Sequence, residues 1–239
     1  FVHLPLLLNP DKSKLSKRQG DVDVESFLKK GYLKETIINF IALLGWHPNN
    51  DQEIFDINFL IKNFSINKIQ KSGAIFDNKK LNWMNSMYIK KLNIKEFILL
   101  FSETYPSYKL DFSNGDKLSK IFEFIKNRIK ALDEVPNLLN PFYSTFILKD
   151  SEVLSYIKTE EARLVLQYWY ESISSSQNID EPYINKLIQA TEDKFNLKGK
   201  KIFYPLRGTL YGSFNGPDLF TIISILGISE TKKRLELYI

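Results

Sequence analysis

Apolar residues recur at helical spacing along much of the chain. Between Leu33 and Leu44 they fall three or four positions apart. The same spacing returns later, over 118–132, 162–173, 184–195 and 219–226. An apolar stripe with a period near 3.6 residues predicts an amphipathic helix that packs against a core. The pattern therefore predicts a mainly α-helical protein.

Residues that favour helix ends mark several boundaries. Asp23 precedes a short helix expected to end near Gly31, and Asp56 precedes another. Gly45 is expected to close the helix that begins near Leu33, and Pro106 to stop one over 94–105. Loops are predicted at 107–114, 136–141 and 174–180.

An extended segment and a basic stretch stand before the helices. The apolar run from Val2 to Leu8 predicts a strand, and Asn9-Pro10-Asp11 predicts a turn. Lys12 to Arg18 then places four basic groups in seven residues. Such groups donate hydrogen bonds to phosphate and stabilise negative charge that builds in a transition state. A Walker-type phosphate loop is excluded, because its glycines are missing.

Composition narrows the chemistry further. The net charge of +5 favours an anionic partner. Cysteine is absent and histidine occurs only at His3 and His47, which excludes disulfides, thiol catalysis and a His/Cys zinc site; no metal site is predicted. No uninterrupted apolar run of about 18 residues exists, so no membrane span is expected. No secretory signal is evident, and a cytoplasmic protein is expected.

The basic stretch and its flanks resemble a known signature. His3 to Asp11, followed by Lys14-Leu15-Ser16-Lys17-Arg18, resembles the second signature of class I aminoacyl-tRNA synthetases in its glutamyl form. Later blocks resemble the same family, in this order: Gly31-Tyr32-Leu33, Ala42 to Pro48, Ala74 to Asp77, Lys80 to Asn85, Tyr88-Ile89, Pro205-Leu206-Arg207, Leu210-Tyr211-Gly212 and Gly216 to Leu219. The chain is thus identified as resembling the C-terminal portion of the bacterial-type glutamyl-tRNA synthetase family, whose anticodon region is helical.

The resemblance implies four parts along the chain. Residues 1–20 would end the catalytic domain with the lysine signature loop, and 21–92 would form a helical connecting domain that contacts the tRNA stem. Residues 93–140 and 141–239 would form two all-helical anticodon-binding subdomains. The nucleotide-binding half would precede Phe1, so these 239 residues alone are expected to be inactive.

The resemblance also implies roles for residues of the loop. Lys17 and Lys14 would be catalytic, and Lys14, Ser16, Lys17 and Arg18 would bind ATP. Lys17 would contact the ATP phosphates and steady the departing pyrophosphate. ATP with Mg²⁺, glutamate and tRNA(Glu) are the expected partners of the whole enzyme, with the magnesium ligands outside these residues. A monomer is expected.

Three further residues are expected to contact the tRNA or its anticodon: Arg128, Arg207 and Tyr211. For the two arginines the alternative is a structural ion pair or a charge on a helix surface. Trp83 and Tyr88 are expected in a core rather than stacked on RNA, and both histidines are expected to be structural.

Two other classes of protein would also show apolar stripes at helical spacing, and they are alternative interpretations of this sequence. A non-enzymatic helical RNA-binding module would explain the charge and the helices, but not Lys14 to Arg18 within its particular flanks. A helical scaffold for protein partners would explain the stripes alone.

Overall fold

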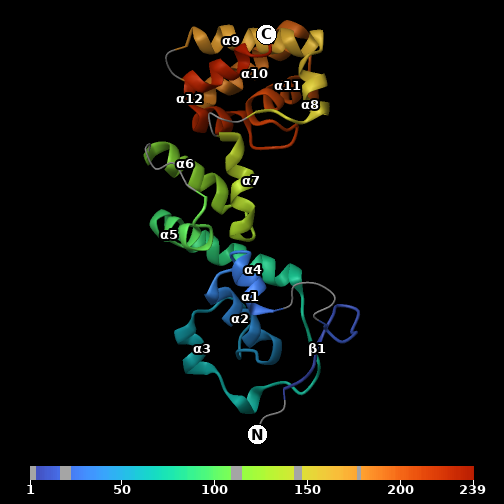
Figure 1. The fold of residues 1–239 in the computed structure, drawn as a ribbon, viewed down its shortest axis with the longest axis vertical. Helices are drawn as coiled ribbons and strands as arrows, with labels where there is room; N and C mark the ends of the chain where they lie inside the picture. Colours follow the sequence, from blue (N-terminus) through green and yellow to red (C-terminus); the bar gives the residue numbers. More distant parts are fainter. Residues whose placement is uncertain (1–3, 17–22, 109–114, 143–146, 177–178) are drawn as a thin grey trace. The chain divides into compact units, whose positions relative to one another are not determined.

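The computed structural model describes residues 4–16, 23–108, 115–142, 147–176 and 179–239. Helices dominate these ranges, and the mainly helical prediction is confirmed (Figure 1). The α-helices are α1 Val24–Lys29, α2 Lys34–Gly45, α3 Ile57–Asn63, α4 Asn78–Lys91, α5 Ile94–Thr104, α6 Gly115–Lys126, α7 Val135–Leu139, α8 Ser151–Ile157, α9 Glu160–Ser174, α10 Glu181–Phe195, α11 Lys200–Tyr211 and α12 Leu219–Glu236. Short 3-10 helices are η2 Ile66–Lys68, η3 Leu132–Glu134 and η4 Asn140–Phe142. Strands β1 Leu7–Leu8 and β2 Ala74–Ile75 pair in parallel.

Most predicted helix ends are confirmed. The side chains of Asp23 and Asp56 accept hydrogen bonds from the first turns of α1 and α3. Helix α2 ends at Gly45, and α5 ends two residues before Pro106. The expected strand over 2–8 is reduced to Leu7–Leu8 within the described residues. Of the predicted loops, 109–114 and 177–178 lie outside the described residues.

The stripe over 118–132 is not one helix. Helix α6 ends at Lys126, and the following segment bonds to a distant part of the chain. The backbone N–H of Leu132 donates to the carbonyl of Gly31 at 3.3 Å, and that of Asp133 donates to Lys30 at 3.1 Å. The helical prediction is therefore wrong beyond residue 126, because tertiary hydrogen bonds replace the helical ones.

The loop predicted over 136–141 is also wrong. Helix α7 and the 3-10 helix η4 occupy this stretch. Pro136 is the second residue of α7, where the missing N–H of proline costs no helical hydrogen bond. Three helices that the apolar pattern did not predict, α4, α8 and α11, are also present.

The chain divides into two compact units. Unit 1 is Phe1–Leu110 with Ile125–Pro136, and unit 2 is Asp111–Phe124 with Asn137–Ile239. In unit 1 helix α2 packs against α3 and α4. In unit 2 helices α9, α11 and α12 pack on one another, with α8 against α11.

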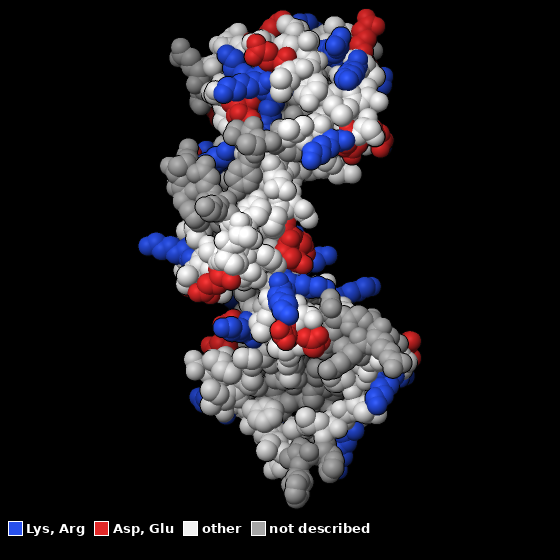
Figure 2. Space-filling view, viewed as in Figure 1, with Lys and Arg blue, Asp and Glu red and all other residues white. Residues whose placement is uncertain are grey.

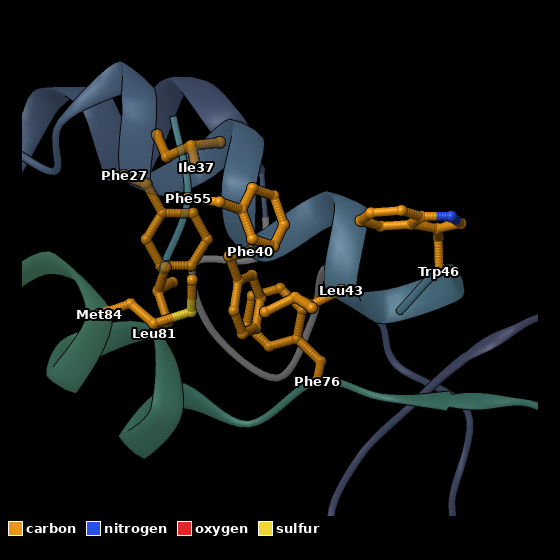
Figure 3. Close-up of a cluster of buried hydrophobic side chains, with 9 residues drawn as sticks. All are labelled: Phe27, Ile37, Phe40, Leu43, Trp46, Phe55, Phe76, Leu81 and Met84. Atoms are coloured by element: carbon orange, nitrogen blue, oxygen red, sulfur yellow. The ribbon is translucent and has the colours of Figure 1, made fainter. Parts of the chain in front are cut away.

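The core of unit 1 is aromatic. Figure 3 shows Phe27, Phe40 and Phe76 close together beside the α4 residues Leu81 and Met84. The ring centroids of Phe40 and Phe76 lie 5.1 Å apart, edge to face, and those of Phe27 and Phe76 lie 5.9 Å apart. Since Phe76 directly precedes the N-cap of α4, this cluster fixes the strand β2 and the start of α4 together.

Candidate functional site

The basic stretch begins in a small hairpin. Asn9 to Lys12 form the predicted turn, and the N–H of Lys12 donates to the carbonyl of Asn9 at 2.9 Å. Leu8 and Lys14 then face each other in an antiparallel bridge, and the N–H of Leu15 donates to the carbonyl of Leu7. Lys14 is exposed and Ser16 is half-buried. The hairpin therefore presents Lys14 to solvent from a hydrogen-bonded backbone.

Polar side chains stabilise the turn itself. The carboxylate of Asp11 accepts the N–H of Ser13 at 2.9 Å and its hydroxyl at 2.6 Å. The amide of Asn9 donates to the same hydroxyl at 2.8 Å. The hydrogen bonds from the hydroxyl and the N–H of Ser13 lower the pKa of Asp11, because they stabilise its charged form. The turn is thus fixed by the residues between the strand and the signature.

The hairpin is attached to unit 1 through β2. Leu7 pairs with Ala74 and Leu8 with Ile75, and the N–H of Phe76 donates to the carbonyl of Leu8 at 2.8 Å. A Cβ at Gly73 would lie 2.6 Å from Leu8 Cδ1, so glycine permits this close approach. The 74–77 block thus anchors the lysine loop. Lys17 and Arg18 themselves lie outside the described residues.

Helix α4 follows β2 and has one exposed face and one buried face. Trp83 is 42% exposed, so the expectation that it lies in a core is wrong. Tyr88 is half-buried as expected: its hydroxyl lies 2.7 Å from Asn39 Oδ1 and 2.6 Å from the carbonyl of Phe55. Burial raises the pKa of Tyr88 to about 12. Its hydroxyl thus joins α4 to Asn39 of α2 and to the backbone of Phe55.

Asn85 is a buried amide that was not predicted from the sequence. It is 0% exposed, on the face of α4 that also carries Leu81 and Ile89. Its Oδ1 accepts the N–H of Leu33 at 2.9 Å, and its Nδ2 donates to the carbonyl of Lys130 at 2.5 Å. The sequence did contain a signal for it: Asn85 is a polar residue four positions after Leu81 and four before Ile89, within an apolar helix face.

Arg128 lies in the turn that follows α6. Its side chain is exposed, and its N–H donates to the carbonyl of Ile125 at 2.8 Å. The residue stands two positions before Lys130, whose carbonyl Asn85 binds. Arg128 belongs to unit 1, together with the lysine-loop hairpin.

Arg207 and Tyr211 lie one turn apart on α11, in unit 2. Arg207 is half-buried; its Nε donates to the carbonyl of Pro217 at 3.0 Å, and its Cζ lies 5.2 Å from the ring centroid of Phe203. Tyr211 is only 8% exposed, and its ring centroid lies 5.5 Å from that of Phe142. A Cβ at Gly216 would lie 2.7 Å from Tyr211 Cδ1. Together these residues hold the 212–218 loop against α11.

Arg234 on α12 also stabilises the last turn of α11, and this role was not predicted from the sequence. It is 5% exposed, and its Nη1 donates to the carbonyls of Leu210 at 2.7 Å and Pro141 at 2.5 Å. Its Nε donates to Glu230 at 2.9 Å. Burial lowers the pKa of Arg234, and the carboxylate of Glu230 opposes that change. The cation therefore joins α12 to the last turn of α11.

Charge on the visible surface is mixed. Figure 2 shows Lys and Arg interspersed with Asp and Glu over the described residues of the face seen. No group of three or more acidic or histidine side chains forms a candidate metal site in the described ranges. Nor does any described helix have the length and apolar character needed to cross a membrane.

Comparison with known proteins assigns the two parts of the chain. Residues 78–239 match the family model described as anticodon binding domain. Residues 1–83 match the model described as tRNA synthetases class I (E and Q), catalytic domain. The first match contains α4 to α12, and the second contains the lysine-loop hairpin.

Relatives agree along almost the whole chain. A glutamate–tRNA ligase of Alkaliphilus metalliredigens is 36% identical over 99% of this chain and 49% of its own length. The ligase of Clostridioides difficile is 34% identical over 98% and 49%. A crystal structure of a glutamate tRNA ligase from Elizabethkingia meningosepticum, in complex with its amino acid, matches 100% of this chain and 51% of that one, with 28% identity and a TM-score of 0.83.

The chain spans about half the length of the curated relatives that it matches. Its mainly helical fold and the matches of 1–83 and 78–239 agree with the resemblance found in the sequence. The chain therefore belongs to the glutamate–tRNA ligase family, of which it carries the C-terminal portion: the end of a class I catalytic domain followed by an anticodon-binding domain.

Proposed function

We propose that this chain is the tRNA-reading part of an enzyme that attaches glutamate to tRNA(Glu) with ATP. One observation carries the proposal: the lysine-signature hairpin and an anticodon-binding domain occur in one chain, in the order that glutamate–tRNA ligases share. The non-enzymatic RNA-binding module gives no reason for that hairpin.

The proposed reaction has two steps. The carboxylate of glutamate attacks the α-phosphate of ATP, which gives glutamyl-adenylate and releases pyrophosphate. A ribose hydroxyl at the end of the tRNA then attacks the glutamyl carbonyl, and AMP leaves. Mg²⁺ enters with ATP as part of the substrate, and we place its ligands outside this chain. The enzyme would act in the cytoplasm as a monomer.

The lysine loop would act by charge alone. Lys17 would contact the phosphates, where negative charge grows as pyrophosphate departs, with Lys14 and Arg18 in support and Ser16 shaping the loop. Fixed cations stabilise such charge most strongly in the transition state. The exposed Lys14, held by the hairpin on β2, supports this role, since the loop then starts from a rigid base.

The anticodon-binding domain would supply the tRNA contacts. Arg128 in unit 1 and Arg207 in unit 2 are the proposed contacts, and the buried Tyr211 would shape the surface beside Arg207 rather than stack on a base. Anticodon bases are unstacked and present their edges to side chains. We assign residues 21–92 to stem contact, and 93–140 and 141–239 to the two anticodon subdomains.

Apolar residues beside the hairpin are exposed, as expected if the rest of a catalytic domain packs on them in the whole enzyme. Leu4, Leu7 and Ile41 are 69%, 38% and 50% exposed and line a cavity of about 400 Å³. Contiguous exposed apolar surface is typical of sites that contact another protein part or a ligand. In the proposed enzyme, the remaining part of the catalytic domain that the relatives carry would cover it.

Aminoacylation tests the proposal directly. The full-length protein that carries this chain is expected to form an ester between glutamate and tRNA(Glu), with one AMP and one pyrophosphate released per ester. Labelled glutamate and acid precipitation of the tRNA measure the product. Omission of ATP is the control, and tRNA binding without any ester would instead favour the RNA-binding module.

A further inference from the structure

Asn85 connects two segments that are far apart in the sequence. Its amide accepts from Leu33 at the start of α2 and donates to the carbonyl of Lys130 after α6. All three residues belong to unit 1. An amide side chain has an acceptor and a donor at fixed separation, so both bonds together define where Lys130 lies relative to α2 and α4.

The segment around Lys130 is held at further points. Leu132 donates to the carbonyl of Gly31, and the N–H of Lys130 donates to the carboxylate of Glu134 at 3.3 Å. The carbonyl of Lys130, which Asn85 binds, lies two residues after Arg128. The turn that carries Arg128 thus runs from the last turn of α6 to a carbonyl fixed by α4.

We propose that Asn85 is a positioning residue for Arg128: its bond to the Lys130 carbonyl fixes the turn from which Arg128 contacts tRNA. The inference rests on the proposed role of Arg128. The groups of a binding site contribute most when they are held within about 0.5 Å of the productive geometry by the residues around them. Without the bond from Asn85, the turn would hold Arg128 less closely in the contact geometry, which lowers affinity without removing the contact group.

A matched pair of variants separates positioning from stability. Asn85→Leu keeps the approximate shape of the side chain and removes both hydrogen bonds that its amide makes. Asn39→Leu is the control: Asn39 is a 2% exposed amide in the same unit, and its Oδ1 accepts the N–H of Phe55 at 3.0 Å. Both variants strip a buried N–H of its acceptor, and Asn39→Leu also removes an acceptor of the Tyr88 hydroxyl on α4, but only Asn85→Leu frees the Lys130 carbonyl.

The test is a double-mutant cycle on tRNA(Glu) affinity, with the full 239-residue chain. Arg128→Ala is expected to weaken binding about tenfold to a hundredfold, the value of a charge-assisted contact. Asn85→Leu is expected to weaken it at least about fivefold when Arg128 is present and less than about twofold in Arg128→Ala. Asn39→Leu is expected to change it less than about twofold in both backgrounds.

Each outcome decides between the two proposals. An equal loss from Asn85→Leu with and without Arg128, or a loss no larger than that of Asn39→Leu, would overturn the positioning role and leave the proposed function standing. No loss from Arg128→Ala would overturn the role of Arg128, and the positioning role with it.

If Asn85→Leu does not fold, a second variant tests the same inference. Glu134→Ala removes the other side-chain contact of Lys130 at a half-buried site. It is expected to weaken binding only in the presence of Arg128, and a loss independent of Arg128 would count against the inference.

Discussion

Replacement of Lys17 by alanine in the full-length enzyme is expected to lower kcat for ATP-dependent glutamate activation by about 100- to 1,000-fold. Removal of one group that stabilises transition-state charge typically has an effect of this size. KM for glutamate should change much less, because Lys17 is proposed to contact the phosphates and not the amino acid. Exchange of labelled pyrophosphate into ATP, with tRNA present, measures the activation step.

The same basic stretch offers the control. Lys12→Ala removes an equal charge from the turn of the hairpin, five residues earlier and outside the lysine signature, and it is expected to leave kcat within about twofold. Equal losses from the two variants would mean that the loop acts through its summed charge, and the specific role of Lys17 would be wrong.

Gly31→Ala is expected to destabilise unit 1 by about 2–5 kcal/mol. Gly31 has a φ of 79°, which costs an L-residue about 1–2 kcal/mol. The added Cβ would also lie 2.4 Å from Leu132 Cβ and 3.0 Å from its backbone N, and such overpacking costs about 1–3 kcal/mol more. Hydrogen exchange of amides in α4 measures the loss, because it reports on unit 1 separately.

Gly199→Ala separates the two causes. Gly199 also has a positive φ, 56°, but nothing lies within 4 Å of the Cβ that alanine would add. Its ψ of −121° lies outside the left-handed helical region, in a conformation that strains any side chain, so its replacement should destabilise unit 2 by about 1–3 kcal/mol, measured on amides of α9. If both variants cost the same, the close packing of Gly31 on Leu132 does not contribute, and the attachment of the 129–134 segment is weaker than we infer.

Much of the fold could be predicted from local signals. Capping carboxylates at Asp23 and Asp56 and the stop at Pro106 act within one turn of chain, so the sequence alone reveals them. The end of α6 at Lys126 could not be predicted in that way. It depends on hydrogen bonds to Lys30 and Gly31, about a hundred residues earlier, and apolar periodicity carries no information about such partners.

In the candidate site, too, the features set by neighbouring residues were predictable and those set by tertiary contacts were not. The turn at Asn9-Pro10-Asp11 was predicted from local signals, but the antiparallel bridge between Leu8 and Lys14 that follows it was not. Asn85 and Arg234 were not predicted as important residues, because both act from within a core. Their importance appears only when the carbonyls that they bind, from Lys130, Leu210 and Pro141, are brought together by folding.

Binding of the 239-residue chain to tRNA(Glu) tests the central claim most directly. Fluorescence anisotropy would compare the native tRNA with one whose anticodon bases are replaced, at a single near-physiological salt concentration, because phosphate contacts contribute equally to both and depend on salt. We predict that the native tRNA binds at least about tenfold more tightly, the effect of losing one base contact. Equal affinities for the two tRNAs would contradict the assignment of anticodon reading to this chain.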